Sequence, residues 1–163
     1  MRQILDPGVA RLKFESEVRA IGGGLHPIPQ NTRMSWRVTK ASYPQFVAEL
    51  IGESVPAIRV VADCTNYDYD PPLVHFRTAR GVPIPWRNLQ LLGRVYSHPK
   101  GLFHDVTMYP NGVGFICREG HFGYHVAHQE PMWLDIRATA KGRLFAIIEN
   151  TLDALNLQAL IGV

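Results

Sequence analysis

The first hydrophobic positions of the chain recur at the spacing of one helix face. Asp6 is a suitable helix cap, and Pro7 suits the first helical position because an N–H would have no partner there. The glycines at 22–24 should end the helix, and a proline-rich connection with Pro27 and Pro29 should follow. The apolar residues expected to share the buried face are Leu12, Phe14, Val18 and Ile21.

The pattern changes between residues 34 and 79, where short runs rich in β-forming residues follow one another. The run 45–50 alternates apolar and polar positions, whereas 57–67 is more continuously apolar, as expected for a strand buried on both faces. Pro71 and Pro72 cannot lie inside a central strand, so they should mark the entry to the last run. We therefore expect an antiparallel meander of four strands, at 34–42, 45–50, 57–67 and 71–79.

Regular periodicity is lost over residues 81–128 and returns in the last part of the chain. A long irregular segment inside a compact domain is often functional. Over 136–160, leucine and isoleucine recur at helical spacing, with Asp135 as a candidate cap and Gly142 as a weak point. The order of helix, four strands, long irregular segment and helix predicts an α+β fold, in which helices cover an antiparallel sheet.

Composition narrows the class of protein. A length of 163 residues suggests a single domain over 1–163, large enough to fold without a metal or a disulfide. The net charge of +3 comes from dispersed residues, not from the clustered patch typical of nucleic-acid binding. No signal-peptide pattern opens the chain, and no apolar run approaches the ~20 residues of a membrane span. We expect a cytoplasmic protein with two free cysteines, no bound cofactor, and neither nucleic acid nor membrane as a partner.

The stretch NGVGFICREGHFGYHVAH, at 111–128, concentrates side chains that could bind a metal. It contains Cys117, His121, His125 and His128, spaced by four, four and three positions. Cysteine and histidine are zinc ligands, so a zinc site is one interpretation. However, Gly120 and Gly123 make a helix here unexpected, and no CxxC or HExxH pair is present. Histidines that only make hydrogen bonds within a loop are the alternative that this pattern favours over a metal site.

Cys117 is also the candidate reactive thiol. Reactive cysteines lie in polar, partly exposed segments near groups that favour the thiolate, and Arg118 and several histidines lie close in sequence. Cys64, inside an apolar strand run, fits a small buried hydrophobic residue instead. A cysteine protease would need a histidine and an orienting group beside Cys117, but no protease signature is present.

Several motifs, in the same order along the chain, resemble those of ubiquitin-conjugating enzymes. The stretch YDYDPPLVHF resembles the family's Y-P-x-x-P-P-x-V-x-F sequence. GFIC resembles the G-x-I-C that carries the active-site cysteine, and Trp133 resembles the tryptophan of W-x-P-A before the next helix. The residues at matching places are Tyr67, Pro71, Pro72, Val74, Phe76, Gly114, Ile116, Cys117 and Trp133. The resemblance covers roughly residues 6–160 and implies the conjugating-enzyme fold.

The chain departs from the family near the cysteine. The family's H-P-N tripeptide supplies an asparagine that stabilises the oxyanion, and here YPN places Asn111 six residues before Cys117. His104 is an alternative for that role. His121 or His125 could deprotonate the incoming amine, because an imidazole titrates near neutral pH.

The resemblance implies a set of partners as well as a reaction. A ubiquitin-like protein would form a thioester with Cys117 after delivery by an activating enzyme, and a target amine would then accept it. The first helix would recruit the activating enzyme through exposed residues such as Arg11, Lys13, Glu15 and Arg19. The departures resemble divergent bacterial members, whose operons serve antiphage defence in some cases. An inactive member of the same fold, which binds a ubiquitin-like protein without chemistry, is a further alternative.

Overall fold

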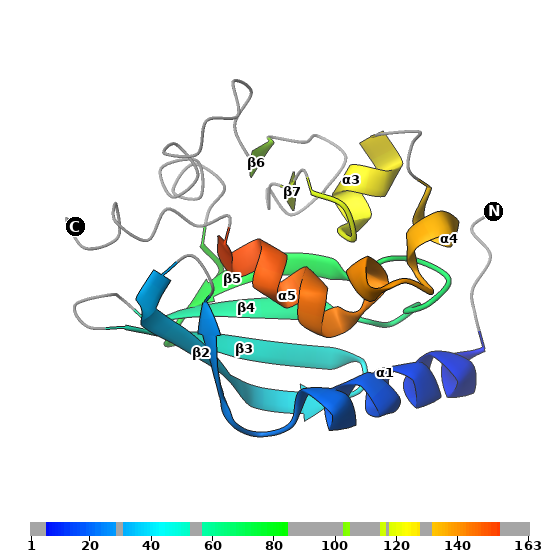
Figure 1. The fold of residues 1–163 in the computed structure, drawn as a ribbon. Helices are drawn as coiled ribbons and strands as arrows, with labels where there is room; N and C mark the ends of the chain where they lie inside the picture. The colour runs from blue at the N-terminus through cyan, green and yellow to red at the C-terminus, as the bar shows by residue number, and fades with distance from the viewer. Residues whose placement is uncertain are drawn as a thin grey trace.

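The computed structural model describes residues 6–28, 31–52, 57–84, 103–104, 115–116, 118–127 and 132–153. The fold is α+β, with one five-stranded antiparallel sheet and helices at both ends of the described chain (Figure 1). The sheet is a meander in the order β1-β2-β3-β4-β5. Its strands are β1 (Leu25–Ile28), β2 (Asn31–Ser42), β3 (Gln45–Gly52), β4 (Ile58–Asp63) and β5 (Leu73–Thr78).

The predicted meander is confirmed, but the strand count of four is wrong because Pro27 in β1 and the nearby Pro29 predict a connection instead of a strand. Pro27 lies inside β1, which pairs only with β2 at the edge of the sheet. A proline is tolerated there because an edge strand leaves part of its backbone without a ladder partner. The pairing is irregular between Pro27 and Ile28, where the register shifts.

The first helix, α1 (Pro7–Ile21), has the predicted bounds. The Asp6 carboxylate accepts a hydrogen bond of 2.7 Å from the N–H of Gly8, and Gly22 ends the helix with φ 72°. The predicted buried face is partly wrong, since Leu12 is 67% exposed. The face that packs on the core carries Ala10, Phe14, Glu17 and Ile21, so a carboxylate takes a position expected to be apolar.

The predicted helix over 136–160 is broken into shorter pieces. These are α4 (Trp133–Ile136), a 3₁₀ turn (Ala140–Gly142) and α5 (Leu144–Asp153), while residues after 153 lie outside the described part. Asp135 does not precede the helix but lies within α4, where its side chain accepts the N–H of Met132 at 3.1 Å. The break is fixed at Gly142, where a Cβ would press on the backbone of Ile136 and Arg137.

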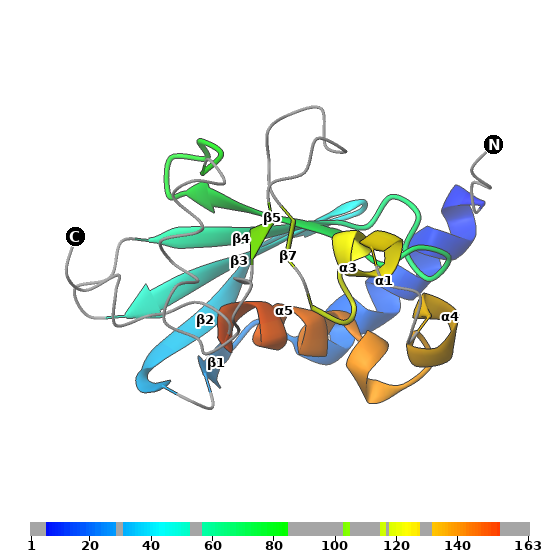
Figure 2. The same cartoon turned by 90° about the horizontal axis from the view of Figure 1, so that it is seen from above.

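Helices α1 and α5 pack on the same face of the sheet. Figures 1 and 2 show α5 lying over one face of the sheet, with α1 beside it. The helical residues of this core are Phe14, Ile21, Leu144, Ile147, Ile148 and Leu152, and they meet Trp36, Phe46, Leu50, Val60 and Phe76 from the sheet. Within the described ranges, no helix is long and apolar enough to cross a membrane.

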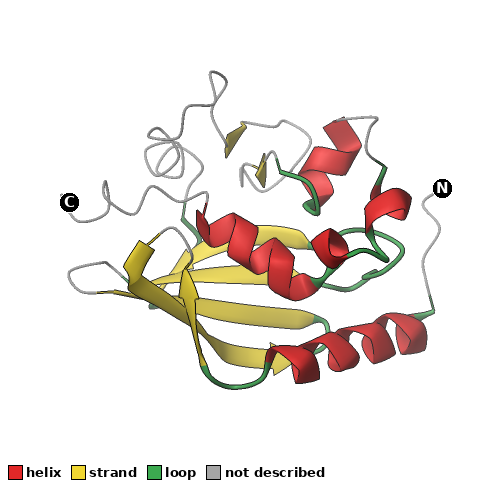
Figure 3. Cartoon of the chain, in the orientation of Figure 1, coloured by secondary structure: helices red, strands yellow, loops and turns green. Residues whose placement is uncertain are grey.

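The described parts of the irregular region form a second small unit above β5 (Figure 3). It contains the two-stranded pair β6 (Phe103–His104) and β7 (Phe115–Ile116), followed by α3 (Phe122–Ala127). The expectation that Gly120 and Gly123 exclude a helix here is wrong. Gly123 lies inside α3, whereas Gly120 precedes it in a turn with φ 86°.

Candidate functional site

The structure describes the residues on both sides of Cys117, while Cys117, Asn111 and His128 themselves lie outside the described residues. The strand β7 ends at Ile116, directly before Cys117 in the sequence. His104 lies in β6, where it is paired in register with Phe115 of β7. The sheet pairing therefore brings the backbone of one predicted site residue level with a position two residues before Cys117.

The residues directly after Cys117 form a turn that leads into α3. The N–H of His121 donates to the carbonyl of Arg118 at 3.1 Å, which closes the turn. The N–H of Phe122 donates to the carbonyl of Pro72 at 3.2 Å, which fixes the start of α3 against the segment before β5. The turn requires Gly120, because a Cβ there would lie 2.8 Å from Cγ1 of Ile147 at a positive φ.

His121 is a fully buried side chain, with 1% of its surface exposed. Its Nε2 lies 3.1 Å from Oγ1 of Thr151 in α5, and that hydroxyl donates its proton to the carbonyl of Ile147 at 2.6 Å. Because a hydroxyl has one proton to donate, Nε2 must carry the hydrogen and donate to Thr151. The other ring nitrogen, Nδ1, is therefore bare and buried, and it has no hydrogen-bond partner within the described structure.

The environment of His121 keeps its ring uncharged. Burial is the main cause that lowers its pKa from 6.5 to about 3, and the positive charge of Arg118 acts in the same direction. A buried imidazole of this kind is not exposed to an amine arriving from solvent, so its predicted role as the general base stays a prediction that its burial disfavours. Its hydrogen bond to Thr151 instead has a structural role, because it joins the turn after Cys117 to α5.

His125 is only partly buried and lies in α3, directly after the same turn. Its Nε2 accepts the N–H of Gly120 at 3.0 Å. Its ring contacts those of Tyr124 and Trp133 edge-on, with centroids 5.1 and 5.8 Å away. The role of His125 as the base also stays a prediction, but this ring is the more accessible of the two.

The described residues contain no group of three or more side chains suited to hold a metal ion. The Nε2 atoms of His121 and His125 are both engaged in hydrogen bonds within the protein. A zinc ion on this stretch would therefore have to use other ring nitrogens or replace these bonds. Two further members of the predicted cluster, Cys117 and His128, lie outside the described residues.

Cys64 is placed as the sequence predicted, as a small buried residue. Its side chain is fully buried directly after β4, and burial together with Asp63 raises the pKa of its thiol well above the ordinary value. Its Sγ lies 3.9 Å from the carbonyl of Ala62. A buried thiol with a raised pKa is a poor nucleophile, so Cys64 does not compete for the role predicted for Cys117.

The sequence did not predict a buried polar junction that joins α1, the β4–β5 connection and α5. Glu17 is 5% exposed, and its Oε2 accepts the hydroxyl of Tyr67 at 2.7 Å and the N–H of Leu144 at 2.6 Å. Its Oε1 lies 2.9 Å from Nζ of Lys13 and 3.4 Å from Nη1 of Arg143. Glu17 thus caps the first turn of a helix that follows it by more than a hundred residues. The sequence offered one signal for this junction, which is an acidic residue on a helix face whose other members are apolar.

Trp133 extends this junction to α4. Its Nε1 donates to the carbonyl of Asp68 at 3.1 Å, and Nη1 of Arg137 donates to the same oxygen at 3.0 Å. The rings of Trp133 and Tyr67 lie 6.3 Å apart. Two aromatic residues from separate motifs are therefore fixed side by side through the backbone of one turn.

A scan against models of known protein families finds no match, and a search of curated proteins finds none either.

Proposed function

We propose that the chain is an acyl carrier of the ubiquitin-conjugating type, with Cys117 as the nucleophile. The observation that carries the proposal is the packing of Tyr67 against Trp133, with Nε1 of Trp133 bonded to the carbonyl of Asp68. These two residues belong to the two stretches whose sequences resemble the family on either side of the cysteine. Residues so distant in sequence lie side by side only if the chain between them folds into a defined structure.

The surroundings of the candidate nucleophile offer further support. A catalytic segment must be held by a rigid scaffold. The turn from Arg118 to Phe122 is tied to the segment before β5 through Pro72 and to α5 through Thr151. Arg118 directly follows Cys117 in the sequence, and a nearby positive charge favours a thiolate.

The proposed reaction proceeds in two acyl transfers. The Cys117 thiolate attacks the C-terminal carbonyl of a ubiquitin-like protein held as a thioester on its activating enzyme, and the enzyme's thiolate leaves. A target amine then attacks the new thioester, so that a C–N bond forms, the C–S bond breaks and Cys117 leaves as thiolate. Dividing one difficult transfer into two easier steps is the usual advantage of covalent catalysis.

Three polar residues have proposed roles in the second step. Asn111, or His104 in its place, would donate a hydrogen bond to the oxyanion, and loss of such a donor typically lowers the rate by about 10²–10³. His125 would accept on Nε2 the proton that the amine releases, and this requires that the hydrogen bond from the N–H of Gly120 to that atom breaks first. His121 is better suited to hold the turn, because its ring is buried and bonded to Thr151.

The activating enzyme would bind α1. Val9 and Leu12 leave about half or more of their surface exposed, at 49% and 67%, although they belong to a helix that packs on the core. Arg11 and Glu15 lie on the exposed side as an i, i+4 pair. An apolar pair flanked by charges is a common composition for a protein interface. The setting proposed for this reaction is the bacterial cytoplasm.

A non-reducing gel tests the proposal directly. The protein is incubated with ATP and with the ubiquitin-like protein and activating enzyme of its own genome. We expect a heavier band that disappears on reduction, is absent in Cys117→Ala, and resists reduction in Cys117→Ser because an oxygen ester forms. Cys64→Ala is the matched control and should keep the band, since Cys64 is buried. Loss of the band in Cys64→Ala but not in Cys117→Ala would overturn the assignment.

A further inference from the structure

The sheet carries a row of charged side chains on the face that α1 and α5 do not cover. Side chains alternate between the two faces along a strand, and the core on the covered face includes Trp36 and Phe76, which directly adjoin members of the row. The register aligns one residue of the row from each strand, and in the order β1 to β5 these are Leu25, Arg37, Glu49, Arg59 and Arg77.

Positive charge exceeds negative charge in this row, because Glu49 is its only carboxylate. Oε1 of Glu49 lies 3.1 Å from Nη2 of Arg37, and Oε2 lies 3.0 Å from Nε of Arg59. The side chain of Glu49 is 13% exposed, whereas those of Arg37 and Arg59 are 54% and 35% exposed. One recessed carboxylate is therefore shared by two guanidinium groups that reach solvent.

Arg77 has no carboxylate partner among the described residues. Its Nε donates to Nε2 of His75 at 3.2 Å. Burial, followed by the charge of Arg77, lowers the pKa of His75, so this acceptor is neutral at pH 7. Arg77 also lies directly opposite Arg59 in the pairing of β4 with β5, and like charges in that position destabilise a sheet. A carboxylate supplied by a partner would relieve this repulsion.

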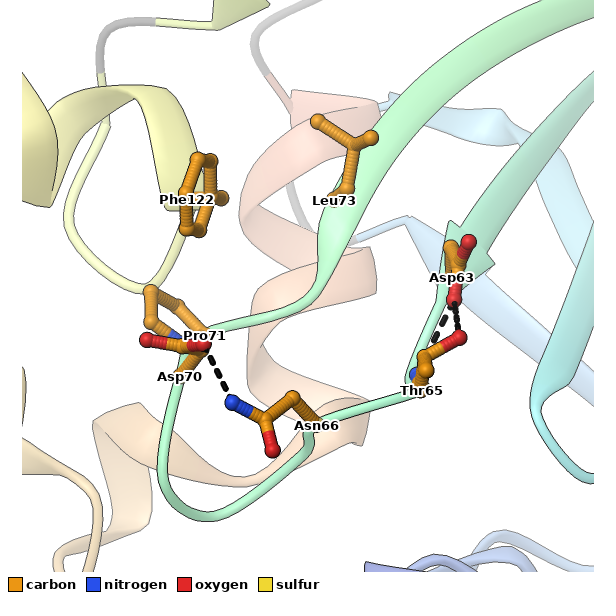
Figure 4. A pocket seen from close by; sticks show the side chains of 7 residues that line it. All are labelled: Asp63, Thr65, Asn66, Asp70, Pro71, Leu73 and Phe122. Atoms are coloured by element: carbon orange, nitrogen blue, oxygen red, sulfur yellow. Dashed lines mark hydrogen bonds between the residues drawn. The ribbon is translucent and has the colours of Figure 1, made fainter. Parts of the chain in front are cut away.

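Asp63, the other carboxylate on this face of β4, lies too far along the strand to pair with the row. It follows Arg59 by four residues, which is roughly 13 Å in a strand. Its Oδ1 accepts the N–H and the hydroxyl of Thr65, at 2.9 and 2.6 Å. With Leu73 and Phe122, Asp63 lines a separate groove of about 360 Å³ (Figure 4). The described part of the sheet thus leaves the positive charge of the row in excess.

Leu25 adds an exposed apolar side chain at the β1 end of the row. It is 65% exposed, and its partner in the register is Arg37. Arginine is enriched at protein interfaces, where apolar contacts lie beside charged ones. The row therefore has the composition of a surface that another protein contacts.

We propose that the row from Leu25 to Arg77 is the docking surface for an acidic segment of a partner protein. Neighbouring strands lie about 4.8 Å apart, so Cα of Arg37 is roughly 10 Å from that of Arg59 and 14 Å from that of Arg77. Carboxylates three or four residues apart in an extended segment span the same distance, at about 3.3 Å per residue. The docking does not depend on Cys117 and stands whether or not the acyl transfer occurs.

The chemistry of the row favours a protein segment over other anions. A planar guanidinium group suits a carboxylate through two parallel hydrogen bonds. Glu49 divides the positive charge into two places, and it would repel a continuous anionic surface such as a nucleic-acid backbone or a phospholipid membrane.

Titration of the ¹⁵N-labelled protein with acetyl-hexaglutamate amide provides the test, read from the ¹⁵N–¹H signals of Arg37, Arg59 and Arg77. We expect saturable shifts with a Kd of about 1 mM at about 0.01 M ionic strength, where charges are weakly screened. Acetyl-hexaglutamine amide has the same length without the charge and should produce no saturable shift. Equal binding of both peptides to the unaltered protein would overturn the proposal without any question of folding.

Two variants should change the affinity for hexaglutamate in opposite directions. Arg77→Gln removes a positive charge without leaving a described carboxylate unpaired, and it should raise the Kd about threefold. Glu49→Gln removes the negative charge of the row and should lower the Kd about threefold, a gain that misfolding would not produce. Lys141→Gln is the control, because Lys141 is exposed on the 3₁₀ turn and should leave the Kd unchanged. An unchanged Kd in Arg77→Gln, or an unchanged or raised Kd in Glu49→Gln, would overturn the proposal.

Two further probes separate a protein segment from other anionic partners. A hexathymidylate oligonucleotide should bind more weakly than hexaglutamate. The protein should not sediment with vesicles of phosphatidylserine and phosphatidylcholine at about 0.15 M ionic strength. Tighter binding of the oligonucleotide, or sedimentation with the vesicles, would overturn a protein segment as the partner.

Discussion

Glu17 and His121 are both buried polar side chains, yet their surroundings differ. Both oxygens of Glu17 are engaged, by Tyr67, Leu144, Lys13 and Arg143. His121 has a single side-chain bond, to Thr151, and its Nδ1 is buried without a partner in the described structure. The first arrangement satisfies a charge and joins three elements, whereas the second leaves a polar atom without a partner among the described residues, next to the turn that follows Cys117.

The difference indicates that Glu17 and His121 have different roles in the fold. A fully bonded buried network rigidifies the elements it joins. An unsatisfied buried polar atom costs free energy, so its presence in a native fold calls for a specific explanation. We therefore expect substitutions at the Glu17 junction to lower stability, and substitutions around His121 to change the behaviour of the turn as well.

Replacing Glu17 by alanine should have the largest effect. The change leaves the hydroxyl of Tyr67 and the N–H of Leu144 without their acceptor, and the loss should lower the free energy of unfolding by about 3–5 kcal/mol. Urea unfolding followed by circular dichroism measures it. Glu15→Gln on the exposed side of the same helix should change stability by less than about 0.5 kcal/mol. A small change in the free energy of unfolding of Glu17→Ala would show that the junction does not stabilise the packing of the elements that it joins.

Gly142→Ala tests the backbone of the same junction. The added methyl group would lie 2.5 Å from Cα of Arg137 and also press on the carbonyl of Ile136, so the 3₁₀ turn must shift. We expect a loss of about 2–3 kcal/mol in the free energy of unfolding, as for other overpacked sites. Gly24→Ala meets no atom within 4 Å and is the control, with little expected change. Equal stability of the two variants would contradict the close approach at Gly142.

The pH dependence of stability tests the burial of His121. Its pKa is about 3 in the folded protein and 6.5 for an exposed ring, so the unfolded chain binds the proton first as the pH falls. The stabilising effect of keeping this ring neutral is complete above about pH 7.5 and is lost as the pH falls through 6.5 toward 3. The loss contributed by this group between about pH 7.5 and 5 should be about 2 kcal/mol.

The comparison with His121→Gln isolates that contribution from all other titrating groups. Glutamine can still donate to Thr151 but does not titrate. Between the same two pH values, the free energy of unfolding of the variant should therefore fall by about 2 kcal/mol less than that of the unaltered protein. Unfolding in urea at about pH 7.5 and pH 5 gives both values. Equal losses of unfolding free energy in the two proteins would mean that the pKa of His121 in the folded protein is not lowered by burial.

Tyr67→Phe should have the smallest effect of the series. The variant keeps the ring against Trp133 and loses only the hydroxyl, which lies 2.7 Å from Glu17 and 3.0 Å from the carbonyl of Gly142. We expect a loss of about 1–2 kcal/mol in the free energy of unfolding. Thermal unfolding beside the unaltered protein measures it. A loss as large as that of Glu17→Ala would mean that the hydroxyl of Tyr67, and not the carboxylate of Glu17, makes the main contribution of the junction to stability.

Local signals in the sequence were reliable where short-range geometry decides the structure. Asp6, Pro7 and Gly22 defined α1 because capping and a positive φ depend on neighbouring residues alone. Pro71 and Pro72 marked the entry to β5 for a similar reason, since a proline cannot donate to a sheet. The same local rules failed at β1, because whether Pro27 is tolerated depends on which side of a strand has a partner.

The candidate site could be predicted only in part. The sequence distinguished Cys64 from Cys117 by context, and the burial of Cys64 agrees with that distinction. It could not distinguish His121 from His125, because the difference lies in Thr151, a residue of α5 thirty positions away. Nor could it identify the groove between Asp63, Leu73 and Phe122, whose walls come from β4, the β4–β5 connection, β5 and α3.

The sequence alone determined the α+β class, the antiparallel meander and the bounds of α1, because periodicity and capping are properties of neighbouring residues. Only the tertiary structure decided that Glu17 caps α5, that His121 is neutral and buried, and that Asp63 and Asp70 face a common groove. Each of these depends on packing between segments distant in the chain. Burial and charge are set by the partners that packing brings together, and no local pattern encodes them.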